Sequence, residues 1–400
     1  MKRIHNFIFG LILISAVLAL CSCARQKLDA DNVYYDYFYN KEQSEYWIFD
    51  SNIAGAVPGE KWEIFDLVVA SRHNGKPVTD VSLNSFSNCQ VIRSVTFEEG
   101  IETIGASVFS DCDNLETAYI PKSVSHLNPS AFTGCNALKE VNVHPDNPYY
   151  CSVDGVVYNK NKTKLVFYPA GKADAEFNIP SGVLVVDDRA FAHCENLKRI
   201  TVPETVALLT YESIYMCNGL EGVTVDENNR VYRTVDGNLY SKDGKIFLRL
   251  YALNANKSFA VPEGVTQIGE GAFYSRKDLL YVVLPSTLTY IDEYAFGECE
   301  NLQGITIPDK VTFIGCRAFW GCDSLISVVI PQSVTYIGEE AFRRCSSLVG
   351  IVFEISHGWQ AIPRGGKFQT VAFVDFETPT EAAYYLKEEY SWREWKRSDQ

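Results

Sequence analysis

The sequence has little histidine and almost no methionine, and it lacks the short motifs that mark most catalytic or metal sites. Its six histidines are scattered, and none is paired with another at metal-ligand spacing: His5, His73, His126, His144, His193 and His357. There is no Cys-x-x-Cys pair, no glycine-rich phosphate loop and no Gly-x-Ser-x-Gly elbow. We therefore expect no enzyme activity, no metal and no cofactor.

Positive charge is also in short supply. The chain has 36 lysines and arginines against 50 aspartates and glutamates, which gives a formal net charge of −14 at pH 7. No basic patch with interleaved aromatic residues stands out. So acidic a chain repels nucleic acid and anionic membrane surfaces, which excludes nucleic acid as a partner. The charge is expected to serve solubility.

The sequence also lacks an apolar run that would span a bilayer comfortably. The run at residues 7–20 is too short for this, and with Lys2 and Arg3 before it, it has the form of an export signal. It ends in Leu20-Cys21-Ser22-Cys23, which resembles the lipobox of bacterial lipoproteins. The sequence thus predicts a lipoprotein signal peptide at 1–22, acylation of Cys23 and attachment to the membrane through this lipid alone. A cleaved secretory signal with incidental cysteines is the alternative.

What the sequence has in abundance is repetition. The stretch that begins at Val265 recurs at intervals of 23 residues, beginning again at Leu288, Val311 and Val334. Each of these coils then has Ala-Phe at its eighth and ninth positions, usually Cys at the twelfth, Leu at the fifteenth, and mostly Val or Ile at the eighteenth and twentieth. The fixed period predicts a solenoid of stacked coils, and the alternation predicts one strand per coil with one buried face.

Nine coils can be placed, with two insertions between them. Coils also begin at Val78, Ile101, Val124, Val183 and Val206, and the third and fifth coils are followed by 36 extra residues. Tyr150, Asp154-Gly155, Tyr158 and Pro180 in the first insertion reappear 82 positions later in the second. We interpret the insertions, at about 147–182 and 229–264, as β-hairpins that turn at Asp-Gly on one edge of the solenoid, each with a third strand, at 164–168 and 245–250. They either shape a groove or are purely structural.

Twelve cysteines in an exported chain would ordinarily suggest a disulfide framework. Eight of them, however, hold the twelfth position of a coil: Cys89, Cys112, Cys135, Cys194, Cys217, Cys299, Cys322 and Cys345. A small, weakly polar side chain suits a tight buried bend, so we predict a ladder of reduced thiols. Disulfides between neighbouring coils are the alternative.

Both ends of the chain break the period, which confines the repeats to residues 78–354. Residues 23–77 are predicted to form a tether and an N-terminal cap, because the first coil would otherwise expose its core and its strand edge. An aromatic binding module is the alternative for this segment. Residues 355–400 are predicted to form a C-terminal cap, irregular to 369, with a strand at 370–376 and a helix at 380–396.

The coil motif Ile-Gly-x-x-Ala-Phe-x-x-Cys-x-x-Leu-x-x-Val-x-Ile-Pro, as it stands at residues 314–331, resembles the BspA-type leucine-rich repeat. The resemblance covers about residues 72–354, and the insertions resemble those found within the same family. It implies a curved right-handed solenoid with parallel strands on one face. Many such proteins are exported or surface-anchored proteins of gut and oral bacteria, and some are implicated in adhesion to host matrix proteins. A fold does not by itself fix the ligand.

Outward-facing positions become apolar in the C-terminal coils. The third position carries Tyr290, Phe313 and Tyr336, which should stack at the ~4.8 Å strand spacing. Together with apolar residues at other outward positions they form the candidate binding stripe: Tyr290, Phe313, Tyr336, Tyr281, Val283, Val329 and Val352. Such a surface marks an interaction site. Alternatively, the C-terminal cap covers it, or the residues are good strand formers without a partner.

These observations predict a β-rich leucine-rich-repeat solenoid of about nine coils, with two β-hairpin insertions and a cap at each end. We expect a non-enzymatic recognition scaffold at the cell surface that binds proteins, such as host matrix proteins, in adhesion or assembly. Glycan binding through the aromatic residues is the alternative. The expected location is the cell envelope, as an outer-membrane lipoprotein exposed at the surface.

Overall fold

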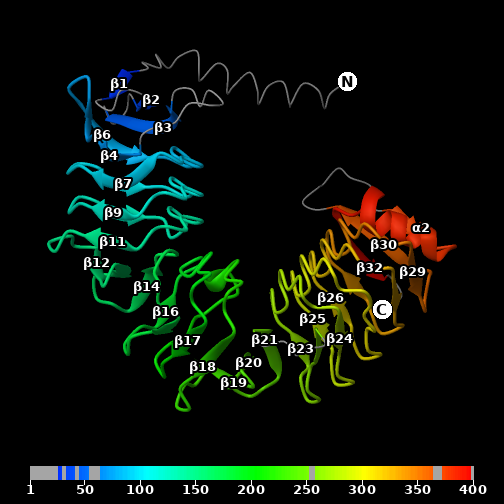
Figure 1. The fold of residues 1–400 in the computed structure, drawn as a ribbon. Helices are drawn as coiled ribbons and strands as arrows, with labels where there is room; N and C mark the ends of the chain where they lie inside the picture. Colours follow the sequence, from blue (N-terminus) through cyan, green and yellow to red (C-terminus); the bar gives the residue numbers. More distant parts are fainter. Residues whose placement is uncertain are drawn as a thin grey trace, which may run out of the picture. The chain divides into compact units, whose positions relative to one another are not determined.

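The computed structural model describes the strands at residues 26–28, 33–40 and 45–53, and then residues 64–251, 257–363 and 372–397. The signal peptide at 1–22 and Cys23 lie outside the described residues, so export and acylation remain predictions. No helix among the described residues has both the length and the apolar character needed to cross a bilayer. The chain divides into two compact units (Figure 1): unit 1 is Met1–Lys198 with Leu208–Leu220, and unit 2 is Arg199–Ala207 with Glu221–Gln400.

A typical coil contributes two strands, one to each of two sheets. In one coil of unit 2 these are the short β26 (Phe313–Ile314), at the third and fourth positions, and the longer β27 (Ser327–Ile330), at the seventeenth to twentieth. Strands of successive coils pair in parallel with an offset of 23 residues: Phe313 pairs with Tyr336, and Val328 with Ile351. The β-rich solenoid with leucine-rich-repeat character is therefore confirmed.

Unit 1 has short strands on one side and long strands on the other. The first sheet follows the order β1 (Gln26–Leu28), β2 (Val33–Asn40), β3 (Glu45–Ile53), β6 (Lys76–Val81), β8 (Thr103–Ile104) and β10 (His126–Leu127), with β5 (Arg72–His73) also on β6. The second is β11 (Glu140–Val143), β9 (Thr117–Ile120), β7 (Ile92–Phe97) and β4 (Phe65–Val69). The first insertion gives a third sheet: β12 (Tyr150–Val153), β13 (Val156–Asn159), β14 (Lys164–Phe167) and β16 (Val185–Val186). Strand β15 (Glu176–Asn178) and the 3-10 helix η1 (Glu212–Ile214) complete the unit.

Unit 2 repeats this arrangement. One continuous sheet contains β19 (Tyr232–Val235), β20 (Asn238–Ser241), β21 (Ile246–Arg249), β23 (Gln267–Ile268), β25 (Tyr290–Ile291), β26, β28 (Tyr336–Ile337), β32 (Arg393–Arg397), β30 (Trp359–Pro363) and β31 (Ala372–Val374). The long strands form three parallel pairs: β17 (Arg199–Val202) with β18 (Gly222–Val225), β22 (Ser258–Ala260) with β24 (Tyr281–Val283), and β27 with β29 (Gly350–Phe353). Figure 1 shows β23, β25 and β26 on one side of unit 2 and β24 and β29 on the other.

Between the two sheets of each unit lies a core of identical side chains stacked from coil to coil. The ninth-position phenylalanines of unit 2 stack face to face, with ring centroids 4.7 Å apart for Phe273–Phe296 and 5.2 Å apart for Phe296–Phe319. These rings are fully buried. Because each ring packs on the next coil, one coil cannot bury its apolar face without its neighbours.

The coil cysteines are free thiols, as predicted, and each of several thiols bonds to the coil before it. All ten cysteines in the described residues are unpaired. Cys299 Sγ donates to the backbone oxygen of Phe273 at 3.1 Å, Cys322 to that of Phe296 at 3.1 Å, and Cys345 to that of Phe319 at 3.0 Å. Burial raises the pKa of Cys299 and Cys345 to about 12, so these thiols keep their proton at neutral pH.

The insertions contain the hairpins and the third strands predicted for them, and each also contains one further coil. Strands β12 and β13 do form a hairpin at Asp154-Gly155, both with positive φ. Strand β14, however, also pairs in parallel with β16, and in the second insertion β21 pairs in parallel with β23. Each insertion is thus a hairpin followed by one further coil. Strands β3 and β4 also continue the parallel ladders at the N-terminal end. With these strands and the two further coils, the solenoid has about 12 coils rather than the nine predicted.

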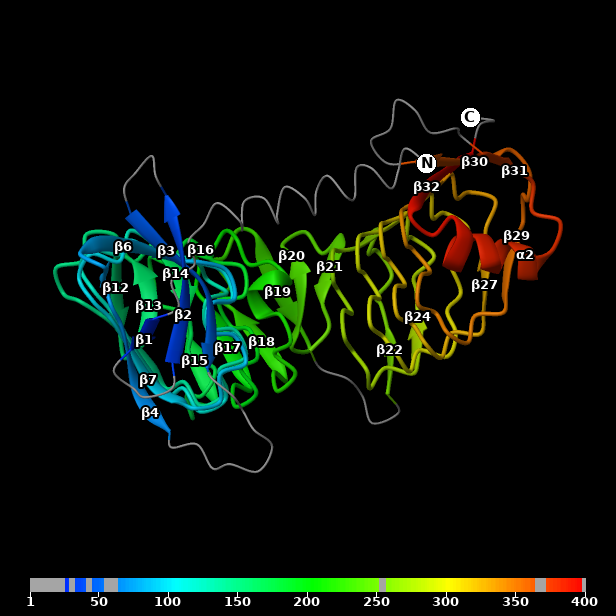
Figure 2. The same cartoon turned by 90° about the horizontal axis from the view of Figure 1, so that it is seen from above.

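The end of unit 2 differs in part from the prediction for residues 355–400. The helix begins as expected, with α2 (Pro379–Tyr384) and the π-helix η2 (Tyr385–Glu389), but Arg393–Arg397 form strand β32 rather than the end of a helix. Strand β30 also lies within the segment predicted to be irregular. Figure 2 shows α2 and β30–β32 together at the end of the unit that carries β29. Strand β32 pairs antiparallel with β28, which covers the edge of the last coil.

Candidate functional site

The aromatic residues at the third coil position do form a continuous stack, which we call the aromatic ladder (Tyr290, Phe313 and Tyr336). The centroids of Tyr290 and Phe313 are 4.1 Å apart at 6°, and those of Phe313 and Tyr336 are 4.4 Å apart at 4°. The free face of Tyr336 is covered in turn by Lys396, whose Nζ lies 5.5 Å from the ring centroid. Phe313 and Tyr336 therefore have both ring faces occupied, and Tyr290 has one face occupied.

The other four residues of the predicted stripe lie elsewhere. Tyr281 and Val283 belong to β24, Val329 to β27 and Val352 to β29, which are long strands, whereas the aromatic ladder lies on the short strands β25, β26 and β28. The single stripe predicted from the sequence is thus two surfaces on two sheets. The error arises because a typical coil has two strands, and outward positions on the two strands face opposite sides of the core.

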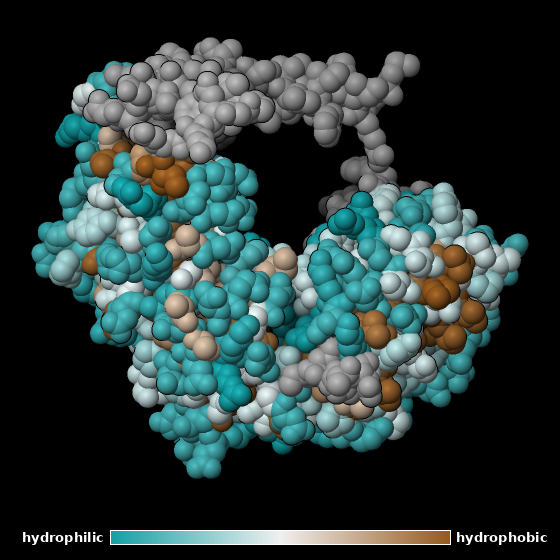
Figure 3. All heavy atoms as spheres, viewed as in Figure 1, coloured by the Kyte–Doolittle hydropathy of each residue, from teal (hydrophilic) through white to brown (hydrophobic). Residues whose placement is uncertain are grey.

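The long strands of unit 2 present an exposed apolar surface, which we call the apolar face. Its members are 43–65% exposed: Tyr281, Val283, Ile326, Val329, Val349 and Val352. Figure 3 shows apolar side chains gathered on the side of unit 2 that carries β24 and β29. Polar pairs border it, among them Lys277–Glu300, with 2.6 Å between Nζ and Oε1, and Ser346 Oγ, which donates to Asp323 Oδ1 at 2.6 Å.

The sixteenth position of the coil is charged in unit 1. The sixteenth position, which is Ile326 and Val349 in unit 2, is Arg93, Glu116 and Lys139 in unit 1. These residues form ion pairs between coils: Arg93 Nη2 lies 2.6 Å from Asp66 Oδ2, and Lys139 Nζ lies 2.8 Å from Glu116 Oε2. The hydrogen bond from Arg93 lowers the pKa of Asp66. The long strands of the coil therefore form with either charged or apolar side chains at this outward position. The fold alone does not require the apolar face.

The long-strand ladder of unit 2 is interrupted within the apolar face. Residues 304–307, which lie between β24 and β27, form an isolated bridge at Tyr281–Gly304 instead of a strand. Beside the interruption is a hollow of about 590 Å³. It is lined by Val282, Val283, Leu284, Thr306, Ile307 and Pro308, with Glu263, Ser286, Asp309 and Lys310 at the polar part of its wall. The apolar face thus includes a concave feature of ligand-pocket size.

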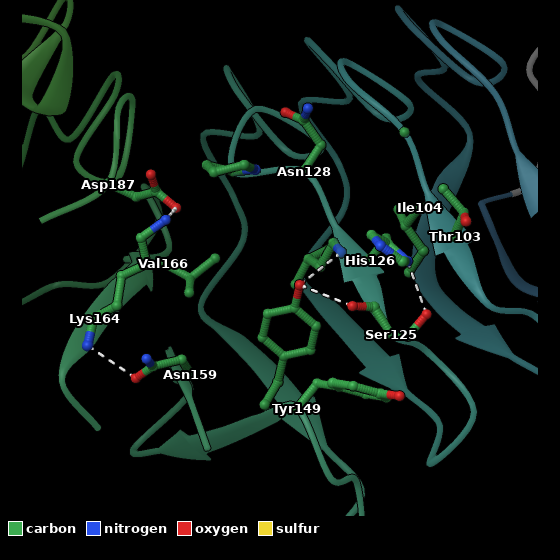
Figure 4. A pocket seen from close by; sticks show the side chains of 14 residues that line it. Thr103, Ile104, Ser125, His126, Asn128, Tyr149, Asn159, Lys164, Val166 and Asp187 are labelled. Atoms are coloured by element: carbon green, nitrogen blue, oxygen red, sulfur yellow. Dashed lines mark hydrogen bonds and ion pairs between the residues drawn. The ribbon is translucent and has the colours of Figure 1, made fainter. Parts of the chain in front are cut away.

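A second hollow, in unit 1, was not identified as a site from the sequence. Its volume is about 570 Å³, and it lies between β8, β10 and the first insertion. Figure 4 shows Lys164 and Asp187 on one side of it, Thr103, Ser125 and His126 on the other, and Tyr149 and Asn128 at its two ends. A comparison of the two insertions residue by residue would have drawn attention to it, because these side chains differ between the copies.

The described residues contain no group of three or more His, Cys, Asp or Glu side chains placed to hold a metal ion. Where histidine is buried, it is isolated from other histidines: burial lowers the pKa of His73 in β5 and of His193, next to Cys194.

Comparisons with known proteins bear on the repeats. The family model described as BspA type leucine rich repeat region matches in six copies, over residues 73–169, 163–235 and 248–359. No match is found among curated proteins. Among solved structures, a leucine-rich cell surface protein of Faecalibacterium prausnitzii A2-165 is 21% identical, with 83% of this chain and 95% of that chain covered and a TM-score of 0.42. The pneumococcal vaccine antigen PcpA is 17% identical, with coverage of 83% and 82% and a TM-score of 0.42. A leucine-rich repeat protein of Bacteroides ovatus ATCC 8483 is 20% identical, with coverage of 82% and 94% and a TM-score of 0.36.

Proposed function

This chain belongs to the BspA-type leucine-rich-repeat family, and on that premise we propose that it is a non-enzymatic recognition scaffold that binds a protein partner through the apolar face of unit 2. The observation that carries the proposal is the exposure of six in-register apolar side chains on β24, β27, β29 and the residues just before them. A contiguous apolar surface of this kind, rimmed by polar residues, is typical of protein interaction sites.

Comparison with unit 1 supports this assignment. Val, Thr, Tyr and Ile are all good strand formers, and unit 1 uses Thr96, Tyr119 and Asn142 at the position that Val329 and Val352 hold in unit 2. Strand formation therefore does not explain the choice of valine. A protein partner that covers these side chains would gain the free energy of removing their apolar area from water.

The hollow beside residues 304–307 gives the partner an anchor point. Interfaces draw most of their binding energy from a few side chains that fill well-defined pockets. The wall formed by Val283, Ile307 and Pro308 fits an aliphatic or aromatic side chain of the partner. Asp309 and Lys310, at the polar part of the wall, can pair with polar groups of the partner. The strand ladder is also interrupted beside this hollow, which favours a partner that presents an extended segment.

The aromatic ladder does not support glycan binding. Sugar rings stack on the faces of aromatic side chains, and both faces of Phe313 and both faces of Tyr336 are occupied within the ladder and by Lys396, which leaves one face of Tyr290. Burial also raises the pKa of Tyr290. We therefore assign the ladder to the stacking of the coils, where each stacked ring pair adds to stability.

The direct test is binding to a panel of purified host-matrix and envelope proteins, measured by surface plasmon resonance. The double variant Val329→Lys with Val352→Lys places two charges on the apolar face and should weaken binding of a protein ligand by at least about tenfold, because a charge buried without a partner is costly. The matched control, Thr96→Lys with Asn142→Lys, makes the same change at the same coil position in unit 1. Equal loss in both variants, or no loss in the first, contradicts the proposal.

We further propose that the protein is held at the cell envelope by acylation of Cys23, exposed at the surface of an outer membrane. The Leu20-Cys21-Ser22-Cys23 sequence supports this, since several acyl chains at ~0.8 kcal/mol per buried CH₂ give a stable anchor. In cell fractionation, Cys23→Ala should move the protein from the membrane fraction to the soluble fraction. Unchanged retention in the membrane contradicts acylation at this residue.

A further inference from the structure

The hollow in unit 1 between β8, β10 and the first insertion has the lining of a saccharide site. One flat aromatic ring, Tyr149, is 53% exposed, and no ring or cation in the described part of the chain stacks on it. His126 and Asn128 are exposed beside it, and Lys164 and Asp187 close the opposite side. An exposed ring next to amide, imidazole and carboxylate groups is the combination that stacks on a sugar ring and hydrogen-bonds its hydroxyls.

The two insertions are built on the same frame, which allows the structural and the ligand-facing residues to be separated. Asn147 Nδ2 donates to the oxygens of Pro121 at 2.8 Å and Val124 at 2.9 Å, and Asn229 makes the same two bonds 82 positions later, at 2.8 and 2.9 Å. The hydroxyl groups of Tyr150 and Tyr232 donate hydrogen bonds to backbone oxygens of the preceding coil, those of Ser125 and Ala207. The hairpins also share strand register and the same irregularity.

The residues that line the hollow do not share this identity. Counting 82 positions onward, His126 becomes Leu208, Tyr149 becomes Val231, Lys164 becomes Ile246 and Asp187 becomes Gly269, while Ser125 becomes Ala207. The second insertion thus builds the same hairpin and the same extra coil without a charged side chain, an imidazole or a tyrosine ring at these positions, while Asn128 becomes the polar Thr210. The fold therefore does not need the side chains of His126, Lys164 and Asp187.

Stability does not account for them either. Lys164 Nζ lies 2.8 Å from Asp187 Oδ2, but the two side chains are 40% and 20% exposed. A partly solvated ion pair of this kind contributes little to stability. Ser125 Oγ lies 2.8 Å from His126 Nδ1, which orients the imidazole with its second nitrogen available for a ligand. Asn128 Oδ1 accepts from Ser130, which leaves its Nδ2 group as a donor toward the hollow.

We propose that this hollow binds a neutral saccharide, with Tyr149 stacked on a sugar ring and His126, Asn128 and the Lys164–Asp187 pair bonded to its hydroxyls. The saccharide is neutral because the one cation and the one anion of the lining neutralise each other. The volume of about 570 Å³ is within the ~300–1,000 Å³ usual for small-ligand sites and admits more than one sugar unit. This site is separate from the apolar face, so the two proposals fail independently.

The test uses the mature full-length protein and a set of neutral disaccharides (maltose, cellobiose, lactose, mannobiose and chitobiose), with an acidic disaccharide set alongside. Ligand-observed NMR at millimolar sugar is expected to show saturation transfer to at least one neutral disaccharide. The variants His126→Leu, Tyr149→Val and Lys164→Ile, each taken from the second insertion, should fold normally and weaken that binding by at least about tenfold.

Two controls make the result specific. Tyr281→Val removes a tyrosine of similar exposure, 49%, from unit 2 and should leave saccharide binding unchanged. Thermal unfolding of the three pocket variants should match that of the parent protein. The proposal is overturned if no neutral disaccharide gives a signal, if only acidic sugars bind, or if the pocket variants bind as well as the parent.

Discussion

At the scale of single residues, the buried cysteines act as donors between coils. Each of the thiols of Cys299, Cys322 and Cys345 reaches the carbonyl of the ninth-position phenylalanine in the preceding coil. Serine would make the same bond with a larger desolvation cost, and alanine would leave the carbonyl without this donor. The row of cysteines is therefore explained by packing and hydrogen bonding, with no need for disulfide chemistry.

This account predicts that Cys322→Ala destabilises the protein by about 1–3 kcal/mol, from a lost inter-coil hydrogen bond and a small cavity. Urea unfolding measures the effect. Cys316 is half-buried, and its Sγ has no hydrogen-bond partner within the described residues, so Cys316→Ala should cost less than about 1 kcal/mol. Equal losses in the two variants would show that the inter-coil bond is not important.

The lowered pKa values of two histidines should make the stability of the fold depend on pH. Burial lowers the pKa of His73 and, against the opposite influence of Asp111 and Glu195, that of His193. In the unfolded chain these histidines take up a proton near pH 6.5, whereas the folded protein resists protonation until lower pH. The unfolded state therefore binds more protons, and stability should fall as the pH is lowered below about 6.5.

Thermal unfolding between pH 7 and pH 5 measures this dependence. The double variant His73→Gln with His193→Gln removes both titrating groups and should flatten the fall in melting temperature over that range. A variant that keeps the full slope of the parent protein would assign the pH dependence to other groups.

At the scale of elements, the sequence predicted the regular coils closely and the insertions only in part. The Asp-Gly hairpins were predicted correctly because the positive φ that this turn needs is visible in its residues. The extra coil at residues 160–182 was missed because it has lost the signature residues: Gly171 replaces the cysteine and Asp174 the leucine. Only Phe177, Ile179 and Pro180 keep the pattern, which is too little to recognise a coil by period alone.

The structure explains one of these replacements and yields a prediction. A Cβ atom at Gly171 would lie 2.4 Å from the carbonyl carbon of Ala137, so the backbone of the extra coil approaches its neighbour too closely for a side chain. Gly171→Ala should destabilise the protein by about 1–3 kcal/mol through overpacking, as measured by chemical denaturation. Gly304→Ala is the control, since nothing lies within 4 Å of the Cβ it would add. The idea of a close approach would be wrong if Gly171→Ala proved as harmless as Gly304→Ala.

At the scale of the whole molecule, one repeat motif produces surfaces of different chemistry. The long strands of unit 1 carry the ion pairs of Arg93 and Lys139, while those of unit 2 carry the apolar face. The sequence predicted which outward residues are apolar but joined them into one stripe, because the period does not reveal that a coil has two strands with opposite outward sides. The hollow in unit 1 was not predicted, since its lining comes from two coils and an insertion, and only the differences between the two insertions pointed to its residues.

The central claim is that a protein partner binds on the apolar face, and hydrogen–deuterium exchange of the full mature protein with a bound protein ligand tests it most directly. We predict slower exchange in the complex at residues 281–284, 303–310, 326–330 and 349–353, with unchanged exchange on the long strands of unit 1. Protection confined to unit 1, or to the aromatic ladder at Tyr290, Phe313 and Tyr336, would contradict the claim.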